Sequence, residues 1–531
     1  MVDDQQFKQL STPRSAQYVS VVGSASDEEV KQRPRPRWLL YSSVVVPLLL
    51  PLQFGWSTSQ LNLSTYNNDD DCAARPVADG ACVLNLSTYN NDDDCAARPV
   101  ADGACVVFPG HTKVQWTFAV NAWFVGGMIG SMLSGNIAEW FGRKRVMQLN
   151  CAFIIAGAVV MAASTGIWMF VVGRFLAGIA SGSTTSVVNN FINEVSPPYL
   201  RSKLGASFQI AITLGILMVG ITFFFTDTSR GWRYAAAFPI VLAVGFLVLA
   251  PFVVVESPSW LLMKGRHLEA QHELARLYGD QNAHLALAWI QPKDNEDIDT
   301  EALSVDPLGQ MVAKGTSASR MLLSPLLLRQ LVAAAGIAIA QQFSGINVVF
   351  LYSSDMFTDA GISDDRIGTV AVDFVNVIPT LFSGALASRF GNRSMLLWGM
   401  VVMFFCALGM TIALLVNVPA LSIVFTALYV AAFELSLGPL SWVIIPDLFP
   451  DAVRAPGSSF CVACNWLSTL IIGVAYPYVA DALGDLGFLP FALTLLFFTG
   501  FVFHMIPETS GKTSEEIQEG FRARLNRGIN L

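Results

Sequence analysis

"YAAAFPIVLAVGFLVLAPFVVV" runs from Tyr234 to Val255 and contains no charged residue. A helix needs about 20 mainly apolar residues to cross the hydrocarbon core of a bilayer. A second run of this kind, "WLLYSSVVVPLLLPLQFGW", covers Trp38 to Trp56. The 531-residue chain is 53% hydrophobic and only 14% charged, and a soluble protein of that composition would expose large apolar patches. Lipid is therefore the solvent for most of the chain.

Further apolar segments extend this pattern on both sides of Tyr234–Val255. They fall into two groups separated by a polar interval: near 39–58, 115–138, 146–165, 168–190, 204–226 and 234–255, and then near 325–352, 367–387, 395–415, 419–446, 456–480 and 487–506. The pattern predicts an all-α membrane protein with twelve transmembrane helices, six on each side of the interval.

Three short signatures recur at a separation of about 250 residues, which indicates an internal repeat. The pairs are "FGRKR" at Phe141 with "FGNRS" at Phe390, "EVSPPYLR" at Glu194 with "DLFPDAVR" at Asp447, and "VESPS" with "PETSG", which align Glu256 with Glu508. The sequence thus predicts two six-helix halves, related as parallel repeats about an axis along the membrane normal. This arrangement suits a carrier whose halves rock around a site at the midplane.

Lys and Arg cluster in alternate loops, and this bias predicts the orientation of the chain. The net charge of −8 does not, because only Lys and Arg near helix ends orient a membrane protein. The basic loops include "GRKR" (142–145), "YLRSK" (199–203), "MKGRH" (263–267), "SRFGNR" (388–393) and "FRARLNR" (521–527). We expect these loops and both termini to be cytoplasmic, in a multi-pass protein of the plasma membrane.

The same reading divides the chain into five parts. These are a disordered cytoplasmic arm (1–37), an N-terminal six-helix half (38–256) with an outer loop (61–106), a cytoplasmic linker with short amphipathic helices (257–324), a C-terminal six-helix half (325–507) and a cytoplasmic tail (508–531).

The outer loop consists of one 23-residue unit, Leu61–Val83, repeated without a difference over Leu84–Val106. Such identity indicates a recent duplication or a sequence-assembly error, and the loop is an appendage to the membrane domain. Each copy carries a glycosylation sequon, of which Asn85 is the better acceptor because Asn62 lies close to the end of the first span. Its cysteines face an oxidising compartment, where they could pair in three ways: Cys72, Cys82, Cys95 and Cys105.

Polar residues inside the apolar spans are the candidates for function, because they are costly in lipid. "QQFSGIN" (Gln341–Asn347) interrupts the seventh span with amides, a hydroxyl and a glycine. Amides and hydroxyls both donate and accept hydrogen bonds, as a sugar hydroxyl requires, whereas a cation would call for carboxylates and an anion for Arg or Lys. Any one of these residues could instead serve a helix–helix hydrogen bond. Further candidates are Gln209, Asn376, Glu434, Asn465, Trp466 and Trp442, whose ring could stack on a pyranose.

The motifs "QFGW", "FGRKR", "GRFLAG", "QQFSGIN", "GPLSWVIIPDLFP", "NW" and "PETSGKT" resemble, in order and position, those of the sugar porter family of the major facilitator superfamily. They are most similar to the animal-type facilitative hexose transporters. The resemblance implies the major facilitator fold and transport of a hexose, glucose or fructose, by alternating access. The sugar site that it implies comprises Gln209, Gln341, Gln342, Asn347, Asn376, Glu434, Trp442, Asn465 and Trp466. The inner gate of charges comprises Arg143, Glu194, Arg201, Glu256, Arg393, Asp447, Arg454 and Glu508.

Several positions depart from the family pattern in the cytoplasmic loops. Trp140 stands where an Arg is usual, Val255 replaces a Pro and Ser259 an Arg. Asn392 replaces an Arg and Asp447 a Glu. These changes predict an inner network of ion pairs that is weaker than the family's but still present.

Energy coupling depends on the first and fourth spans. Symporters of the family carry an Asp in span one that pairs with the Arg of span four, here Arg174. Ser57 stands at the matching position and cannot titrate in the physiological range. Facilitative uniport is therefore favoured, while Asp373 and Glu434 keep a proton-coupled symporter open as the alternative.

Other classes of function fit less well. The five histidines show no nucleophile–base or metal-ligand spacing, so we expect neither an enzyme nor a cofactor or metal site. A membrane sugar sensor on the same scaffold would carry a long cytoplasmic tail, and the tail after Pro507 is short. The partners that we expect are a small sugar and the lipid bilayer, with no nucleic acid, and the chain should act as a monomer.

Overall fold

The computed structural model describes residues 35–61, 108, 113–226, 230–290, 318–348, 365–416, 418–513 and 516–521. Every regular element in these residues is a helix. Eleven helical segments are long and apolar enough to cross a membrane, and the shorter apolar helix Leu489–Met505 adds a twelfth. The predicted all-α, twelve-span architecture is thereby confirmed. The predicted acceptors and disulfide candidates of the outer loop lie outside the described residues: Asn62, Asn85, Cys72, Cys82, Cys95 and Cys105.

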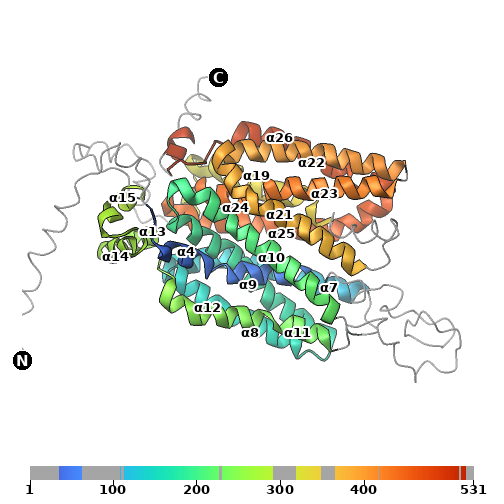
Figure 1. Cartoon of the computed structure of the whole chain (residues 1–531), viewed down its shortest axis with the longest axis horizontal. Coiled ribbons are helices and arrows are strands. Elements are labelled where there is room, and N and C mark those ends of the chain that lie inside the picture. Colours follow the sequence, from blue (N-terminus) through green and yellow to red (C-terminus); the bar gives the residue numbers. More distant parts are fainter. Residues whose placement is uncertain are drawn as a thin grey trace, which may run out of the picture.

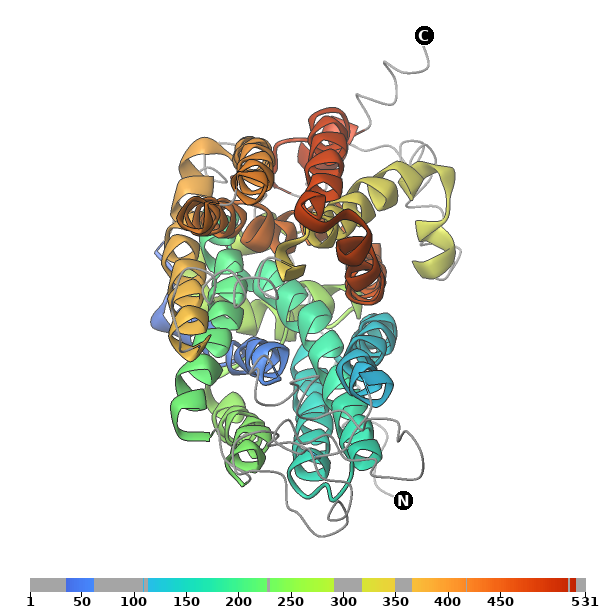
Figure 2. The same cartoon turned by 90° about the vertical axis from the view of Figure 1, so that its right-hand side faces the viewer.

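The N-terminal half forms one bundle, coloured blue to green in Figures 1 and 2. Proline breaks two of its spans into paired helices, because it lacks the N–H group that a continuous helix needs. Its helices are α4 (Trp38–Val45), α5 (Leu49–Ser59), α7 (Lys113–Phe141), α8 (Arg143–Ala162), α9 (Ile167–Val195), α10 (Pro198–Thr226), α11 (Gly231–Ala237) and α12 (Pro239–Val253).

The C-terminal half forms a second bundle, coloured yellow to red, beside the first (Figures 1 and 2). Several helix pairs join the bundles, among them α10 packed along α21 and α24, and α7 packed along α25. The helices of this half are α19 (Pro325–Phe343), α21 (Asp365–Phe390), α22 (Asn392–Leu415), α23 (Pro419–Leu435), α24 (Leu437–Asp447), α25 (Arg454–Leu483) and α26 (Leu489–Met505).

The predicted repeat appears as the same local structure at the start of α8 and of α22. Gly142 and Gly391 precede these helices with φ angles of 92° and 94°, which favour glycine. The Glu256 carboxylate accepts N–H groups from the first two residues of α8 at 2.8 and 3.2 Å. The Glu508 carboxylate does the same for α22, at the same distances. Burial raises the pKa of Glu256, and the backbone N–H donors oppose that rise.

Glycine lets the helices within the N-terminal half approach closely. A Cβ atom added to Gly182 of α9 would lie 1.9 Å from the carbonyl oxygen of Gly127 in α7. A Cβ on Gly55 of α5 would lie equally close, at 1.9 Å, to the carbonyl oxygen of Ile212 in α10. Small residues are the usual means of tight helix packing in lipid. The helices of this half therefore pack closely, and such packing suits a rigid-body movement of the whole half.

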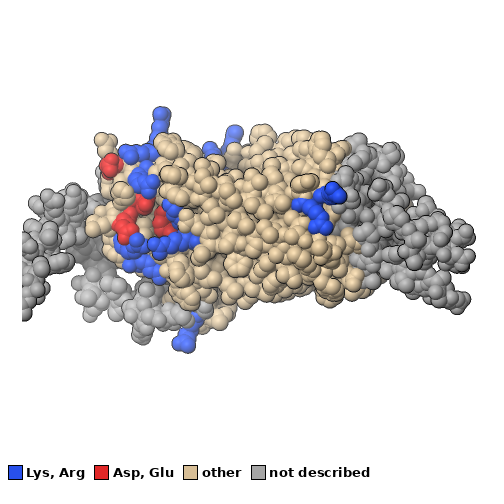
Figure 3. Space-filling model, turned by 90° about the horizontal axis from the view of Figure 1, so that it is seen from below, with Lys and Arg blue, Asp and Glu red and all other residues tan. Residues whose placement is uncertain are grey.

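Short helices cover one end of the N-terminal bundle: α13 (Pro258–Met263), α14 (His267–Tyr278) and α15 (Ala283–Ala288) (Figure 1). The Tyr278 hydroxyl donates to the carbonyl oxygen of Val195 at 2.7 Å, and burial raises the pKa of this phenol. Trp260 donates to the carbonyl oxygen of Glu139 at 2.9 Å. Figure 3 shows acidic and basic side chains gathered at this same end, beside a broad uncharged belt. The belt is the surface that lipid would cover.

Candidate functional site

Two breaks in the C-terminal half bring polar groups to the middle of the bundle. The first follows Phe343, where Gly345 adopts a φ of 83°. The second lies at Ser436, between α23 and α24. The Gln341 side chain connects the two breaks by donating to the carbonyl oxygens of Leu437 and Gly438 at 3.3 and 2.9 Å. Broken helices expose backbone groups only where protein or a polar cavity can satisfy them.

One polar cluster joins the two halves. Gln209 of α10 donates to both oxygens of Glu434 at 3.2 and 3.3 Å. The Trp442 indole donates to the Gln209 carbonyl oxygen at 3.0 Å. Thr380 of α21 donates to Glu434 at 2.9 Å. The structure therefore brings three of the predicted sugar-site residues into direct contact, across the boundary between the bundles.

A second polar cluster lies within the C-terminal half. Asn347 donates to the Gln342 carbonyl oxygen at 2.8 Å, and Gln342 donates to the Asn465 oxygen at 3.2 Å. Asn465 in turn donates to the Gln341 oxygen at 2.7 Å. These amides bond to one another, and Gln342 and Asn347 are half-buried. Each amide hydrogen bond in this cluster could be exchanged for one to a ligand hydroxyl.

Two predicted residues lie beside these clusters without joining them. Asn376 is on α21, one turn from Thr380, and its side-chain oxygen is buried with no hydrogen-bond partner among the described residues. Trp466 donates to Thr185 of α9 at 3.4 Å, and its ring meets that of Trp123 edge-on at 4.8 Å. Asn376 thus offers a free acceptor, and Trp466 forms an aromatic contact between the halves.

Sequence analysis missed several residues of this region. Trp123 of α7 and Thr380 of α21 contact predicted site residues directly. The Asn189 side chain donates to the carbonyl oxygen of Trp442 at 2.7 Å. Asn189 and Asn193 lie one turn apart in the fourth span, and both are buried with side-chain oxygens that have no partner among the described residues. Their spacing in an apolar span was the signal that could have revealed them.

The coupling-related residues occupy one buried region near the first and fourth spans. Arg174 is 2% exposed and donates to the backbone carbonyl oxygen of Ser57 at 2.8 Å. The Ser57 hydroxyl accepts a hydrogen bond from Gln53 at 2.8 Å. No acidic side chain in the described parts of the chain forms an ion pair with Arg174. Asp373 lies apart from these residues, on α21. One of its carboxylate oxygens is buried beside Gly220 and has no hydrogen-bond partner among the described residues.

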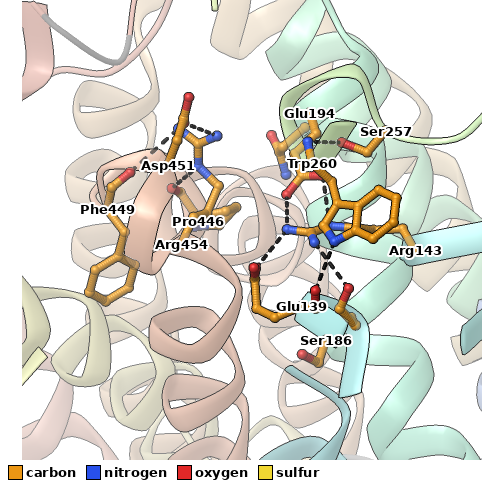
Figure 4. Close-up of polar contacts among 12 residues, drawn as sticks. Glu139, Arg143, Ser186, Glu194, Ser257, Trp260, Pro446, Phe449, Asp451 and Arg454 are labelled. Carbon is orange, nitrogen blue, oxygen red and sulfur yellow. Dashed lines mark hydrogen bonds and ion pairs between the residues drawn. The ribbon is translucent and has the colours of Figure 1, made fainter. Parts of the chain in front are cut away.

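Three of the eight inner-gate residues, Arg143, Glu194 and Arg454, pair within one half. Arg143 and Glu194 form a two-bond ion pair at 2.8 and 2.9 Å, and each side chain is 1% exposed. Glu139 adds a contact to Arg143 at 3.0 Å. Figure 4 also shows a second group, in which Arg454 pairs with Asp451 and donates to the carbonyl oxygen of Pro446, all within the second half. Neither arrangement connects the bundles, so neither needs to break when the halves separate.

Arg201 and Asp447 form the one ion pair between described residues that crosses from the first half to the second, at 3.2 Å. A neutral hydrogen bond accompanies it, in which the Ser202 hydroxyl donates to Asn392 at 3.1 Å. Asn392 occupies the repeat position of Arg143 and so cannot form a matching ion pair. Among the gate charges of the described residues, a single ion pair therefore links the halves.

Three gate residues behave differently from the expectation that they would pair with opposite charges. Glu256 and Glu508 instead accept backbone N–H groups at helix starts, where unpaired N–H groups favour a carboxylate. Arg393 forms no ion pair with a described residue, and its guanidinium donates to the carbonyl oxygen of Phe503 at 2.6 Å. The gate role of these three residues therefore stays a prediction.

The chain is similar to known transport proteins. The model of the family described as "Sugar (and other) transporter" matches residues 44–521. The facilitated glucose transporter member 4 of solute carrier family 2 from Mus musculus is 35% identical over 425 residues, covering 78% of this chain and 81% of the relative. A probable metabolite transport protein, CsbC of Bacillus subtilis, is 30% identical over 416 residues, covering 77% and 86%.

A solved structure shares the fold at lower sequence identity. It is the proton:xylose symporter XylE bound to 6-bromo-6-deoxy-D-glucose, with a TM-score of 0.73, 23% identity and coverage of 91% of this chain and 99% of that chain. This likeness supports the major facilitator fold. From the family match over most of its length, the chain belongs to the sugar (and other) transporter family.

Proposed function

We propose that the protein carries a hexose, glucose or fructose, across the plasma membrane by alternating access and without coupling to protons. The observation that carries this proposal is the pair of midplane clusters, in which neutral amides predominate and both halves contribute. Gln209 comes from the first half, whereas Glu434 and Trp442 come from the second. A ligand held by such groups contacts both halves, so its binding can favour their closure around it.

The chemistry of the clusters supports a polyhydroxylated ligand. Amides offer donors and acceptors together, and the Glu434 carboxylate offers acceptors only. Trp442 and Trp466 could present ring faces to the CH groups of a sugar once their hydrogen bonds to Gln209 and Thr185 open. No Lys or Arg joins either cluster in the described parts of the chain, which disfavours an anionic substrate. The relatives are transporters, one named for glucose, and we propose transport without an enzymatic reaction.

The remaining features of the proposal concern topology. We place the charge-rich end with α13, α14 and α15 in the cytoplasm together with both termini. The sequence-defined parts 1–37, 38–256, 257–324, 325–507 and 508–531 then become the arm, first half, linker, second half and tail. Asn85 would be glycosylated outside the cell. Each half has its own apolar core, and one chain supplies both sides of the site, so a monomer is sufficient for transport.

Opening toward the cytoplasm should depend on the Arg201–Asp447 pair. Asp447→Asn removes the charge that Arg201 meets in this structure, where the side chains of Asp447 and Arg201 are 4% and 13% exposed. Water would solvate Arg201 in the open form, so the equilibrium shifts toward opening, by about tenfold for a loss of about 1.4 kcal/mol. We expect faster alkylation, from the cytoplasmic side, of a cysteine placed at Ser196, which lines the cavity at this end.

Asp451→Asn is the matched control, because Asp451 pairs with Arg454 inside one half. That pair does not separate when the halves move, so its loss should leave the alkylation rate unchanged. Equal acceleration by the two variants would contradict a special role for the pair that crosses the halves.

Energy coupling is the part of the proposal that a flux measurement can decide. Arg174 is bonded to a backbone carbonyl and not to a titrating acid in the described residues, so no proton-controlled pair exists at the family's coupling position. In proteoliposomes, the labelled hexose should equilibrate and should not accumulate under an inward proton gradient. A panel of glucose, fructose, galactose and xylose identifies the substrate in the same assay.

A proton symporter is the second candidate, because Asp373 and Glu434 are carboxylates inside the spans, 4% and 2% exposed. Accumulation that an uncoupler abolishes would support it and contradict uniport. Asp373→Asn and Glu434→Gln would then show which carboxylate carries the proton, since only the carrier's neutral variant should lose accumulation while retaining exchange.

A further inference from the structure

The membrane face of the C-terminal half carries a groove between α22 and α26, which pack side by side (Figure 1). The groove has a volume of about 570 Å³, and Leu397, Val401 and Leu496 form much of its apolar wall. Trp398 and Phe503, both lining residues, are 68% and 57% exposed. Both helices belong to the transmembrane set, so this groove opens to lipid and not to water.

The groove begins at the charge-rich end of the bundle and extends into the apolar belt. Its lining includes Ser394, near the start of α22, and Val401, seven residues later, which corresponds to a depth of about 10 Å along a helix. Gly500 of α26 leaves part of the groove open, because a Cβ atom there would meet nothing within 4 Å. An extended hydrocarbon chain could therefore enter between the helices.

Arg393 lies at the charged end of this groove, next to Ser394. Its guanidinium donates to the Phe503 carbonyl oxygen at 2.6 Å and lies 5.3 Å from the Phe503 ring centre. These contacts hold the cation beside a lining residue. Its Nε is buried without a partner in the described residues, and the nearby Glu508 carboxylate is engaged by backbone N–H groups. The guanidinium thus retains hydrogen-bonding capacity that no described acid uses.

We propose that this groove binds an anionic glycerophospholipid of the cytoplasmic leaflet, with an acyl chain between α22 and α26 and the phosphate on Arg393. A planar guanidinium matches phosphate oxygens in charge and geometry, and a basic group near the leaflet surface attracts anionic lipid. The apolar wall selects for hydrocarbon, and the cation at its end selects for the headgroup. The site is separate from the sugar clusters and does not depend on the proposed substrate.

Native mass spectrometry of the purified full-length protein, exchanged into phosphatidylglycerol or phosphatidylcholine, tests the site. We expect wild-type protein to retain phosphatidylglycerol about fivefold better, the preference that one basic group near a membrane surface provides. Gly500→Leu fills the groove and should reduce retention of both lipids. Arg393→Gln should remove the preference while leaving the acyl groove intact.

Gly245→Leu in α12 is the matched control, because a Cβ there meets only Leu49 at 3.7 Å. It should retain phosphatidylglycerol like the wild type. Equal retention by the Gly500→Leu and Gly245→Leu variants would overturn the groove, and an undiminished preference in Arg393→Gln would overturn the headgroup contact. If Gly500→Leu fails to fold, the Arg393→Gln comparison still decides the anionic specificity.

Discussion

Gln342→Leu should abolish most hexose uptake while the protein still reaches the cell surface. Gln342 links Asn347 and Asn465 through its two amide atoms, and leucine keeps its approximate volume while removing both hydrogen bonds. The variant loses the contacts that we assign to the sugar and leaves partner amides unpaired, at about 1–3 kcal/mol for each. Uptake should therefore fall by at least about tenfold. Initial uptake rates, normalised to surface-labelled protein, measure the effect.

Gln330→Leu supplies the matched control on the same helix, α19. Gln330 also donates a side-chain amide hydrogen bond, to Gln518 at 2.6 Å, and is 5% exposed. It lies three turns away from Gln342, close to the cytoplasmic end. Transport by this variant should stay near the wild-type rate. Normal uptake by well-expressed Gln342→Leu would remove the second cluster from the sugar site.

Arg143→Leu should cause the largest loss of stability among single changes to the charge network. Its removal leaves Glu194 buried and unpaired, since each side chain is only 1% exposed. Breaking a buried pair in this way costs about 3–5 kcal/mol. We expect poor surface expression and a lower melting temperature of the detergent-purified protein. Arg266→Ala, which breaks an exposed pair with Glu269, should change the melting temperature little.

The double variant Arg143→Leu with Glu194→Leu separates charge burial from other effects. Replacing both partners of a buried pair by apolar groups is often neutral or stabilising. We therefore expect the double variant to recover much of the stability that Arg143→Leu loses. No recovery would mean that Arg143 acts mainly through Glu139 and the Ala138 carbonyl oxygen, to which it also donates.

Hydropathy alone was sufficient to place the spans, because a bilayer imposes one length and one polarity on every helix. The prediction of a segment over 234–255 agrees with the observed span Gly231–Val253. Hydropathy did not show where a helix is interrupted inside a span. The seventh segment was expected over 325–352 and the observed span is Leu327–Val348, but hydropathy did not show that α19 ends at Phe343, where Gly345 turns the chain with a positive φ. The repeat at about 250 residues was likewise visible in the sequence. In the structure its two copies place a Glu carboxylate on the first N–H groups of α8 and of α22 in the same way.

The site was less predictable, because pairwise contacts depend on how distant helices pack. Polar residues in apolar spans identified Gln209 and Glu434 separately, and only the fold shows that they touch. Charge does not distinguish the gate residue Arg201, whose ion pair joins the two halves, from Arg143, whose ion pair lies within one half. Glu256 shows the same limit, since its partners are backbone N–H groups that no sequence pattern displays.

The hydrogen bonds that the amides of the second cluster make to one another have a consequence for turnover. A hexose entering the second cluster must replace bonds such as Asn465 to Gln341, at 2.7 Å, so each bond gained by the sugar is offset by one that the protein gives up. Binding by such an exchange should release little heat and be weak, near the millimolar range that corresponds to about −4 kcal/mol. For a passive carrier, low affinity favours rapid transport, because a weakly bound sugar dissociates quickly on the other side of the membrane. A ligand that bound tightly would act as an inhibitor and not as a substrate.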